Sequence, residues 1–120
     1  MQLSAGELER YRQTARRNDA ARKLRLDERR QNGLIVARKA AEILKRDFGV
    51  TRVKLIGSLI HPELFHSKSD IDLAVWDIQH LYRAVSKLLD IDPEFEIDVI
   101  PVEDASPELV KVIEGEGVDI

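Results

Sequence analysis

The spacing of apolar residues changes along this chain, from a helical period before about residue 48 to an extended period in several later segments. Between residues 34 and 48 they recur every three or four positions, which predicts a helix with one buried face. Alternation at 71–75 and 95–100 predicts strands that each bury one face, and the apolar run 53–56 predicts a further strand. This order predicts an α/β fold in which a small mixed sheet is flanked by helices.

A long N-terminal helix is expected before these elements. The capping pattern Ser4-x-x-Glu7 predicts its start, and good helix formers without proline follow to about residue 31. The pair Asn32-Gly33 is interpreted as a break before the next helix. We therefore divide the chain into a basic N-terminal helical extension, residues 1–31, and a compact domain, residues 32–120. The interrupted apolar stripe of the extension is compatible with pairing between two copies, packing on the chain's own core or docking of a partner.

Two shorter helices are expected among and after the strands. Asp77 is expected to cap the first of them, which continues to about Leu88 before a proline interrupts it. Ser106 is expected to cap the second, which ends near Glu114.

Charge is distributed unevenly along the 120 residues. Residues 1–46 carry 13 Lys and Arg against 6 Asp and Glu, whereas residues 47–120 carry 6 against 16. This asymmetry is compatible with a basic arm for nucleic acid, a basic helix that packs on an acidic partner, or an acidic site that binds cations. Nucleic acid is disfavoured as a partner because the isoelectric point is about 5.6 and no run of aromatic residues interleaves the arginines.

The absence of cysteine excludes several chemistries at once. The chain has no disulfide, no thiolate metal ligand and no thiol nucleophile of its own, which fits a reducing compartment. The N-terminal residues lack the apolar segment of a secretory signal, and no apolar stretch approaches the length that spans a bilayer. A soluble cytoplasmic protein without a membrane partner is expected.

Three aspartates occupy strand positions that usually avoid this residue: Asp70, Asp72 and Asp98. Side chains two apart on a strand share a face, so Asp70 and Asp72 project together, and Asp98 joins them if the two strands are neighbours. Three carboxylates at one place repel unless they are protonated, solvated or bound to cations. Because Mg²⁺ prefers a few carboxylates, waters and substrate phosphates, the pattern predicts a site for two Mg²⁺ ions that performs phosphoryl-type transfer. Asp98 is expected on the side of the attacking group, where it can accept the proton of the nucleophile.

A Gly57-Ser58 pair at the end of the first predicted strand precedes these acids. Glycine lets the backbone approach a ligand closely, and serine offers a hydroxyl and an amide to phosphate oxygens. The pair by itself is a weak signal. Together with the three aspartates it forms a specific four-part pattern.

This pattern resembles the hallmark of nucleotidyltransferases of the DNA polymerase beta superfamily: Gly-Ser, about ten residues, Asp-x-Asp and a later Asp. The resemblance covers roughly residues 34–100, in the correct order of elements. The short length is similar to that of the minimal nucleotidyltransferases (MNT proteins), which are commonly partners of HEPN ribonuclease toxins. The resemblance implies the palm-like nucleotidyltransferase fold, with the N-terminal helical extension outside the hallmark.

The resemblance also implies roles for the matching residues. Gly57 and Ser58 would bind the triphosphate of ATP, Asp70 and Asp72 would bind both metal ions, and Asp98 would bind the catalytic metal ion. The larger members of the superfamily have a second domain that closes over the nucleotide, for which this chain has no room, so selection of the base stays open.

Other chemically capable residues are interpreted as ordinary surface or structural groups. Glu96 is expected to be a solvated acid and Lys68 an exposed loop residue, whereas Ser69 is expected to orient its turn. The three histidines lack metal-ligand spacing, and Trp76 is expected to pack at a strand end.

The expected function is that of a protein adenylyltransferase, which moves AMP from ATP to a hydroxyl side chain of a partner, as the antitoxin of a HEPN/MNT toxin–antitoxin pair. The alternative is a catalytically idle binding module that neutralises a toxin by occlusion, with the basic helix as its docking surface. Transfer to a small molecule or RNA is a third possibility. The sequence also leaves self-association open.

Overall fold

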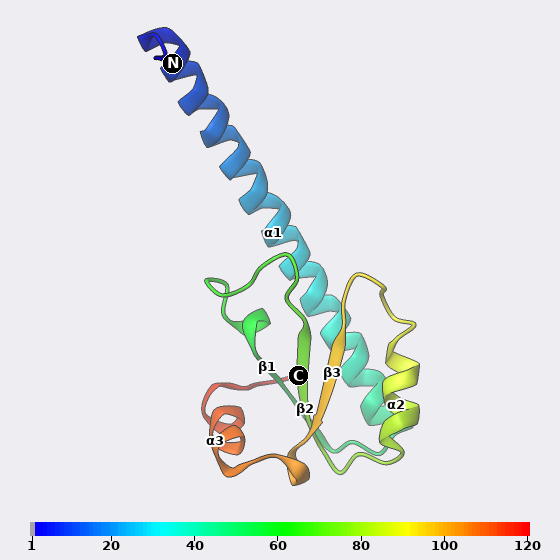
Figure 1. Cartoon of the computed structure of the whole chain (residues 1–120). Helices are drawn as coiled ribbons and strands as arrows, with labels where there is room; N and C mark the ends of the chain where they lie inside the picture. The colour runs from blue at the N-terminus through cyan, green and yellow to red at the C-terminus, as the bar shows by residue number, and fades with distance from the viewer. Residues whose placement is uncertain (1) are drawn as a thin grey trace.

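The computed structural model describes residues 2–120 and shows helices packed on a small sheet (Figure 1). The chain forms two 3₁₀ turns, η1 (Ser58–Ile60) and η2 (Val102–Asp104), each shortly after a strand. The helices and strands are, in chain order, α1 (Ala5–Asp47), β1 (Arg52–Ile56), β2 (Ile71–Trp76), α2 (Leu81–Leu88), β3 (Ile97–Pro101), α3 (Pro107–Glu116) and β4 (Val118–Asp119).

The four strands form one mixed sheet in the order β3-β2-β1-β4. Strand β1 is antiparallel to both β2 and β4, and β2 is parallel to β3. The prediction of a small mixed sheet flanked by helices is confirmed. Strand β4 was not predicted, because a two-residue strand is too short to show any periodicity.

Helix α1 is one continuous helix of 43 residues, so the prediction of a break at Asn32-Gly33 was wrong. Gly33 is buried in the middle of this helix, and a Cβ there would lie 2.9 Å from Leu59 Cδ1 and 3.3 Å from Phe95 Cε1. The glycine therefore accommodates two closely packed side chains and does not end the helix. The predicted capping at Ser4 is confirmed, since its side-chain oxygen accepts a hydrogen bond from the Glu7 amide.

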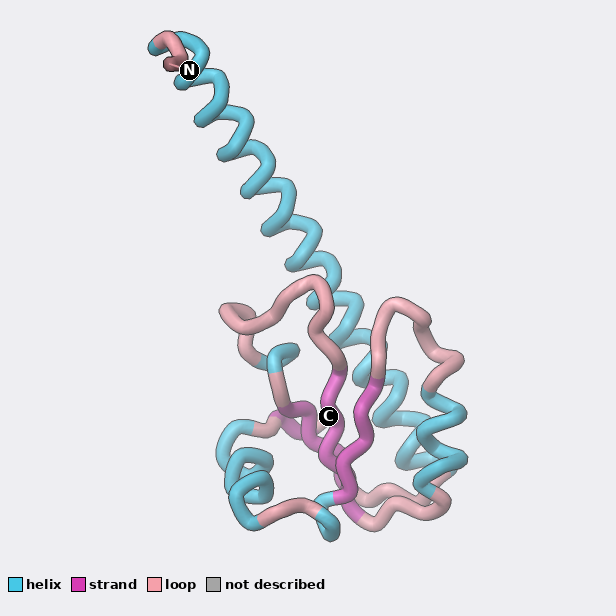
Figure 2. The backbone as a smooth tube through the Cα atoms, in the orientation of Figure 1, coloured by secondary structure: helices cyan, strands magenta, loops and turns pink. Residues whose placement is uncertain are grey.

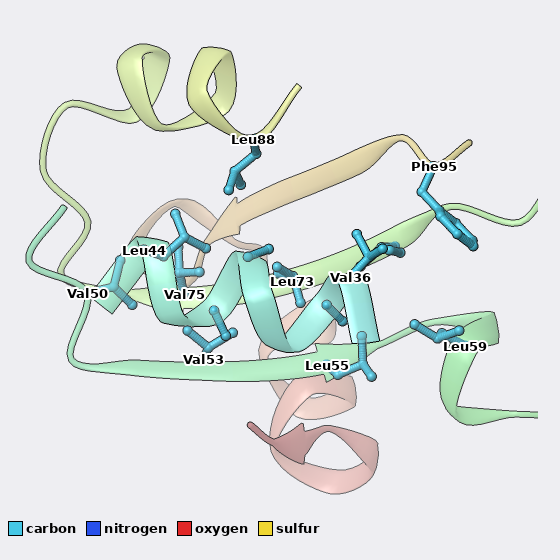
Figure 3. Packing of buried hydrophobic residues seen from close by; sticks show 14 of the residues in the cluster. Val36, Leu44, Val50, Val53, Leu55, Leu59, Leu73, Val75, Leu88 and Phe95 are labelled. Atoms are coloured by element: carbon cyan, nitrogen blue, oxygen red, sulfur yellow. The ribbon is translucent and has the colours of Figure 1, made fainter. Parts of the chain in front are cut away.

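The hydrophobic core lies between the C-terminal half of α1, α2 and one face of the sheet (Figure 3). Leu44 of α1 packs in this core with alternate residues of β1 and β2, such as Leu55 and Leu73. The opposite face of the sheet carries a smaller cluster of Ile56, Ala74 and Ile113, through which α3 covers part of that face. The central strands β1 and β2 therefore bury apolar residues on both faces, whereas the residues of β3 and β4 are partly or fully exposed.

The connection between β2 and α2 differs from expectation. Asp77 was predicted to cap a helix starting at the next residue, but the helix begins at Leu81 after His80, which has a left-handed backbone conformation. Asp77 also has positive φ, and its carboxylate accepts a hydrogen bond of 2.6 Å from the Thr51 hydroxyl. The carboxylate thus fixes a turn beside the start of β1. By contrast, the predicted cap of α3 is confirmed, because Ser106 Oγ accepts from the Leu109 amide.

The N-terminal half of α1 projects from the body as an exposed arm (Figures 1 and 2). Residues 2–25 are all exposed, and Leu26 is the first residue of the helix that packs on the core. The arm stretches the molecule to 65 Å along its longest axis. Despite its length α1 is too polar to cross a membrane, and no other helix within residues 2–120 meets the requirement either.

Candidate active site

Asp72 and Asp98 lie directly opposite each other on the parallel strands β2 and β3. Their neighbours Ile71 and Leu73 point into the core beneath α1, so both aspartates project from the other face of the sheet, the one that α3 partly covers. Strands β2 and β3 begin at the end of the sheet from which the N-terminal half of α1 projects (Figure 1). The two strands are therefore neighbours, which is the condition under which Asp98 lies beside Asp72.

The Asp72 carboxyl is half-buried, and its pKa is raised to about 6. Burial contributes most to this shift, followed by the charge of Asp98, a side-chain hydrogen bond with Asp98 and the charge of Asp70. Asp98 itself is exposed. The cluster thus has the excess negative charge that a cation would neutralise.

Gly57 lies against Asp72 at the end of β1, where Ile56 is the strand partner of Asp72. Its φ of +80° is rarely adopted by other residues, and a Cβ added to it would overlap Asp72 Oδ2. Ser58 follows as the first residue of η1 and is partly buried. The Gly57-Ser58 backbone therefore passes directly beside the acidic pair.

Asp70 immediately precedes β2 and is presented by a tight turn. In this turn the Ser69 hydroxyl accepts a hydrogen bond of 2.9 Å from the His66 amide, and the Ser69 amide donates to the His66 carbonyl at 3.0 Å. Ser69 is buried, with 4% of its surface exposed. This geometry confirms that Ser69 orients the turn that leads to the acidic pair.

The remaining polar residues near this edge have other environments. Glu96 and Lys68 are exposed, as expected. His61 lies 3.3 Å from a carboxylate oxygen of Glu116, and His66 Nδ1 accepts from the Lys68 amide. These histidines are therefore engaged away from the aspartates.

The three aspartates offer a divalent cation only part of a coordination shell. Within residues 2–120 no three acidic or histidine side chains are already gathered closely enough to enclose a metal ion. However, Mg²⁺ commonly takes only one or two carboxylates and completes its shell with waters and substrate phosphates. The facing carboxylates of Asp72 and Asp98 fit that mode, and Asp70 is near enough for its charge to affect Asp72.

Sequence reasoning missed two arginines that contact the loops of this site, Arg29 and Arg30. Arg29 Nη2 donates to the carbonyl oxygens of Ser69 and Glu94, and Arg30 Nε donates to that of Leu59. Both fall in the basic N-terminal extension, residues 1–31, to which the sequence assigned no part in the site. No signal in the sequence separates them from the other arginines of this stretch, because their carbonyl partners lie far away along the chain.

A cavity of about 490 Å³ lies beside the site, between α1 and the turn that precedes Asp70. The acidic pair does not line it; its walls are Arg22, Arg25, Leu26, Arg29, His66 and Ser67. The carboxylates instead lie on the sheet face away from α1, with Asp98 open to solvent.

No model of a known protein family matches the chain. No curated protein matches it either. Two solved structures are similar: a toxin–antitoxin complex with AMP-PNP, with 21% identity and a TM-score of 0.58, and a mutant of the toxin–antitoxin MntA–HpeT, with 19% identity and a TM-score of 0.57. Each similarity covers 69% of this chain and 70% of the other. The chain has the nucleotidyltransferase fold. At these identities the likeness establishes the fold and its resemblance to toxin–antitoxin proteins of the MntA type.

Proposed function

We propose that this protein is a metal-dependent nucleotidyltransferase that moves AMP from ATP to a hydroxyl side chain of a partner protein. The observation that carries the proposal is the in-register pair Asp72 and Asp98, with Gly57 packed directly against Asp72. An acidic pair that can hold cations, beside a turn whose amides and hydroxyl can meet phosphate oxygens, suits phosphoryl-type transfer, which depends on positioning and on neutralising phosphate charge.

In this reaction the acceptor hydroxyl oxygen attacks the α-phosphorus of ATP. A new P–O bond forms, the bond between the α- and β-phosphates breaks, and pyrophosphate leaves. Asp70 and Asp72 would hold two Mg²⁺ ions and Asp98 one of them; the ions supply neutralisation of the phosphate charge. The Ser58 hydroxyl and the Gly57-Ser58 backbone bind the triphosphate, and the Asp98 carboxylate accepts the proton of the acceptor hydroxyl. Exposure of Asp98 allows a hydroxyl on the surface of another protein to reach it.

The proposed partner is a toxin of the HEPN class, with this chain as the cytoplasmic antitoxin. Support comes from the two similar structures, one of which is a toxin–antitoxin with AMP-PNP. The other carries two Asp-to-Glu substitutions two positions apart, the spacing that separates Asp70 from Asp72 here.

The decisive experiment measures transfer of label from α-labelled ATP with Mg²⁺ to the co-purified or genetically neighbouring protein. We expect Asp72→Asn to abolish labelling, because it removes one of the two carboxylates of the acidic pair. The same variant should bind the partner as tightly as the wild type does. Glu96→Gln is the matched control: it removes an exposed negative charge from the same part of the chain and should leave labelling unchanged.

A second pair of variants tests the phosphate-binding turn. Gly57→Ala and Gly49→Ala impose similar backbone strain, because both glycines have a positive φ, +80° and +68°. The added methyl group presses on Asp72 in the first variant and only on the side chain of Gln79 in the second. Both should lower stability by about 1–2 kcal/mol, but only Gly57→Ala should abolish labelling. Equal labelling by the two variants would contradict the proposed role of the turn.

The second candidate is a catalytically idle module that occludes a toxin. The observation favouring it is the exposed basic arm of residues 2–25, which offers a docking surface that owes nothing to the aspartates. A tight complex that neutralises the toxin with no label transferred, and equally well with Asp72→Asn, would establish this function instead.

A further inference from the structure

Three separate loops surround the candidate site at the end of the sheet where β1 ends and β2 and β3 begin. Gly57-Ser58 and η1 follow β1, the turn at residues 66–69 leads to Asp70, and residues 94–96 lead to β3 and Asp98. Strand pairing fixes Asp72 against Asp98, but the loops themselves extend beyond the ladder. Catalysis by positioning requires that all three keep fixed relative places.

Two consecutive residues of α1 contact all three loops. Arg29 Nη2 donates to the Ser69 carbonyl at 3.3 Å and to the Glu94 carbonyl at 3.1 Å, which joins the loop before Asp70 to the loop before Asp98. Arg30 Nε donates to the Leu59 carbonyl at 2.9 Å, in the turn that follows Gly57-Ser58.

Packing around the Arg29 side chain restricts its movement and so stabilises these hydrogen bonds. The Arg29 guanidinium stacks on the Phe95 ring at 4.3 Å from its centroid, and its Nε is buried without a hydrogen-bond partner within residues 2–120. Arg29 is partly buried and its Nε is shielded from water, so water can only partly replace the carbonyl partners of the guanidinium, and losing them is costly. One turn further along α1, Gly33 lets Leu59 and Phe95 approach the helix backbone closely.

We infer that Arg29 and Arg30 are positioning residues of the candidate site, which hold its three loops in register from the opposite side of the sheet. They touch neither the aspartates nor any group that reacts. Their action is on the carbonyl groups one residue before Asp70, four before Asp98 and two after Gly57. The catalytic consequence rests on the proposed function, whereas the effect on loop order does not.

The test compares the full-length variants Arg29→Met, Arg29→Lys and Arg30→Met with the full-length wild type. Hydrogen–deuterium exchange reports loop order directly: Arg29→Met should speed exchange in residues 66–72 and 94–99, and Arg30→Met in residues 57–61. Mn²⁺ binding, followed by electron paramagnetic resonance, should weaken about tenfold in both, as expected when groups behind metal ligands are removed. In AMP transfer kcat should fall about tenfold or more with a smaller change in KM. Arg29→Lys keeps the positive charge but lacks the planar guanidinium that donates to both carbonyl oxygens. It should therefore restore little of the loop order, Mn²⁺ affinity and kcat that Arg29→Met loses.

Arg25→Met is the matched control, since it removes the same charge one turn earlier from an exposed side chain. It should match the wild type in all three measurements. The inference is overturned if Arg29→Met and Arg30→Met lower Tm while exchange in these loops and Mn²⁺ affinity stay at wild-type values. If the wild type binds no Mn²⁺ and transfers no label, the proposed function fails, and localised exchange still supports or overturns the positioning role by itself.

Discussion

At Asp72, burial and neighbouring charge act in the same direction on a single carboxyl group. Both favour its protonated form, so its pKa is about 6 in a chain without bound metal. An ordinary surface aspartate would have no such preference. The acidic pair is therefore a locally unfavourable arrangement, which a bound cation would relieve.

This arrangement predicts a pH dependence of the metal-free protein. Because the folded pKa of Asp72 lies above its unfolded value of 3.8, the folded state binds the proton more tightly. The resulting stability is fully present below about pH 4 and is lost as pH rises through about 6. We expect this group to lower the free energy of unfolding by about 1 kcal/mol across that window, after allowance for solvent screening.

Urea unfolding in EDTA at pH 4.5 and pH 7.5 measures the effect, with Asp72→Asn as the comparison. The variant should be more stable than the wild type at pH 7.5 and closer to it at pH 4.5. Glu96→Gln serves as the control for loss of an exposed acid. An unchanged pH profile in Asp72→Asn would contradict the assignment.

Among the elements, those with clear periodicity could be predicted from the sequence. Strand β1 follows from a short apolar run, strands β2 and β3 follow from alternation, and the start of α3 follows from the capping residue Ser106. The Asp70, Asp72 and Asp98 pattern could be extracted for the same reason, since it depends on positions along strands. The proximity of Asp72 to Asp98 needed one further fact, that β2 and β3 are neighbours.

What could not be predicted depended on contacts between distant segments. Gly33 signals a helix break in isolation, and only the packing of Leu59 and Phe95 explains a glycine inside α1. Arg29 and Arg30 likewise look like members of a solvated basic stretch, because their carbonyl partners lie 29 to 65 residues away. Asp77 failed as a cap because its carboxylate is bound to Thr51 across the sheet end.

Gly33→Ala tests whether this tight packing outweighs helix propensity. Alanine in a helix is normally favoured over glycine by about 1 kcal/mol, but here its methyl group would press on two buried side chains, at a cost of about 1–3 kcal/mol. We expect a net loss of stability in thermal unfolding. Gly115→Ala in α3, where the added methyl group meets nothing within 4 Å, should instead raise Tm. A rise of Tm in both variants would show that Leu59 and Phe95 pack only loosely against Gly33.

The whole molecule is far more extended than its length requires. Its radius of gyration is 19.4 Å, against about 14 Å for a compact domain of this size. The difference comes from the arm, which also separates a basic region from an acidic body.

Small-angle X-ray scattering at low protein concentration and high salt tests this shape. We expect a radius of gyration of about 19–20 Å with a pair-distance distribution skewed toward long distances. Ala15→Pro, which breaks the arm where no core contact exists, should reduce helical circular dichroism and leave the Tm of the body unchanged. A value near 14 Å for the wild type would show that the arm folds back on the body.

The continuity of α1 also bears on how fast and how tightly a molecule can engage the arm. An isolated helix of this length must first nucleate, which is improbable in water. Here the buried half of α1 is a permanent nucleus, so the arm only frays from its tip and regrows within about a microsecond. A ligand that docks along it meets a surface already ordered and forgoes the entropy loss that a disordered tail suffers on capture. Residence time on the arm is then governed by the contacts made there, without a folding step in either direction.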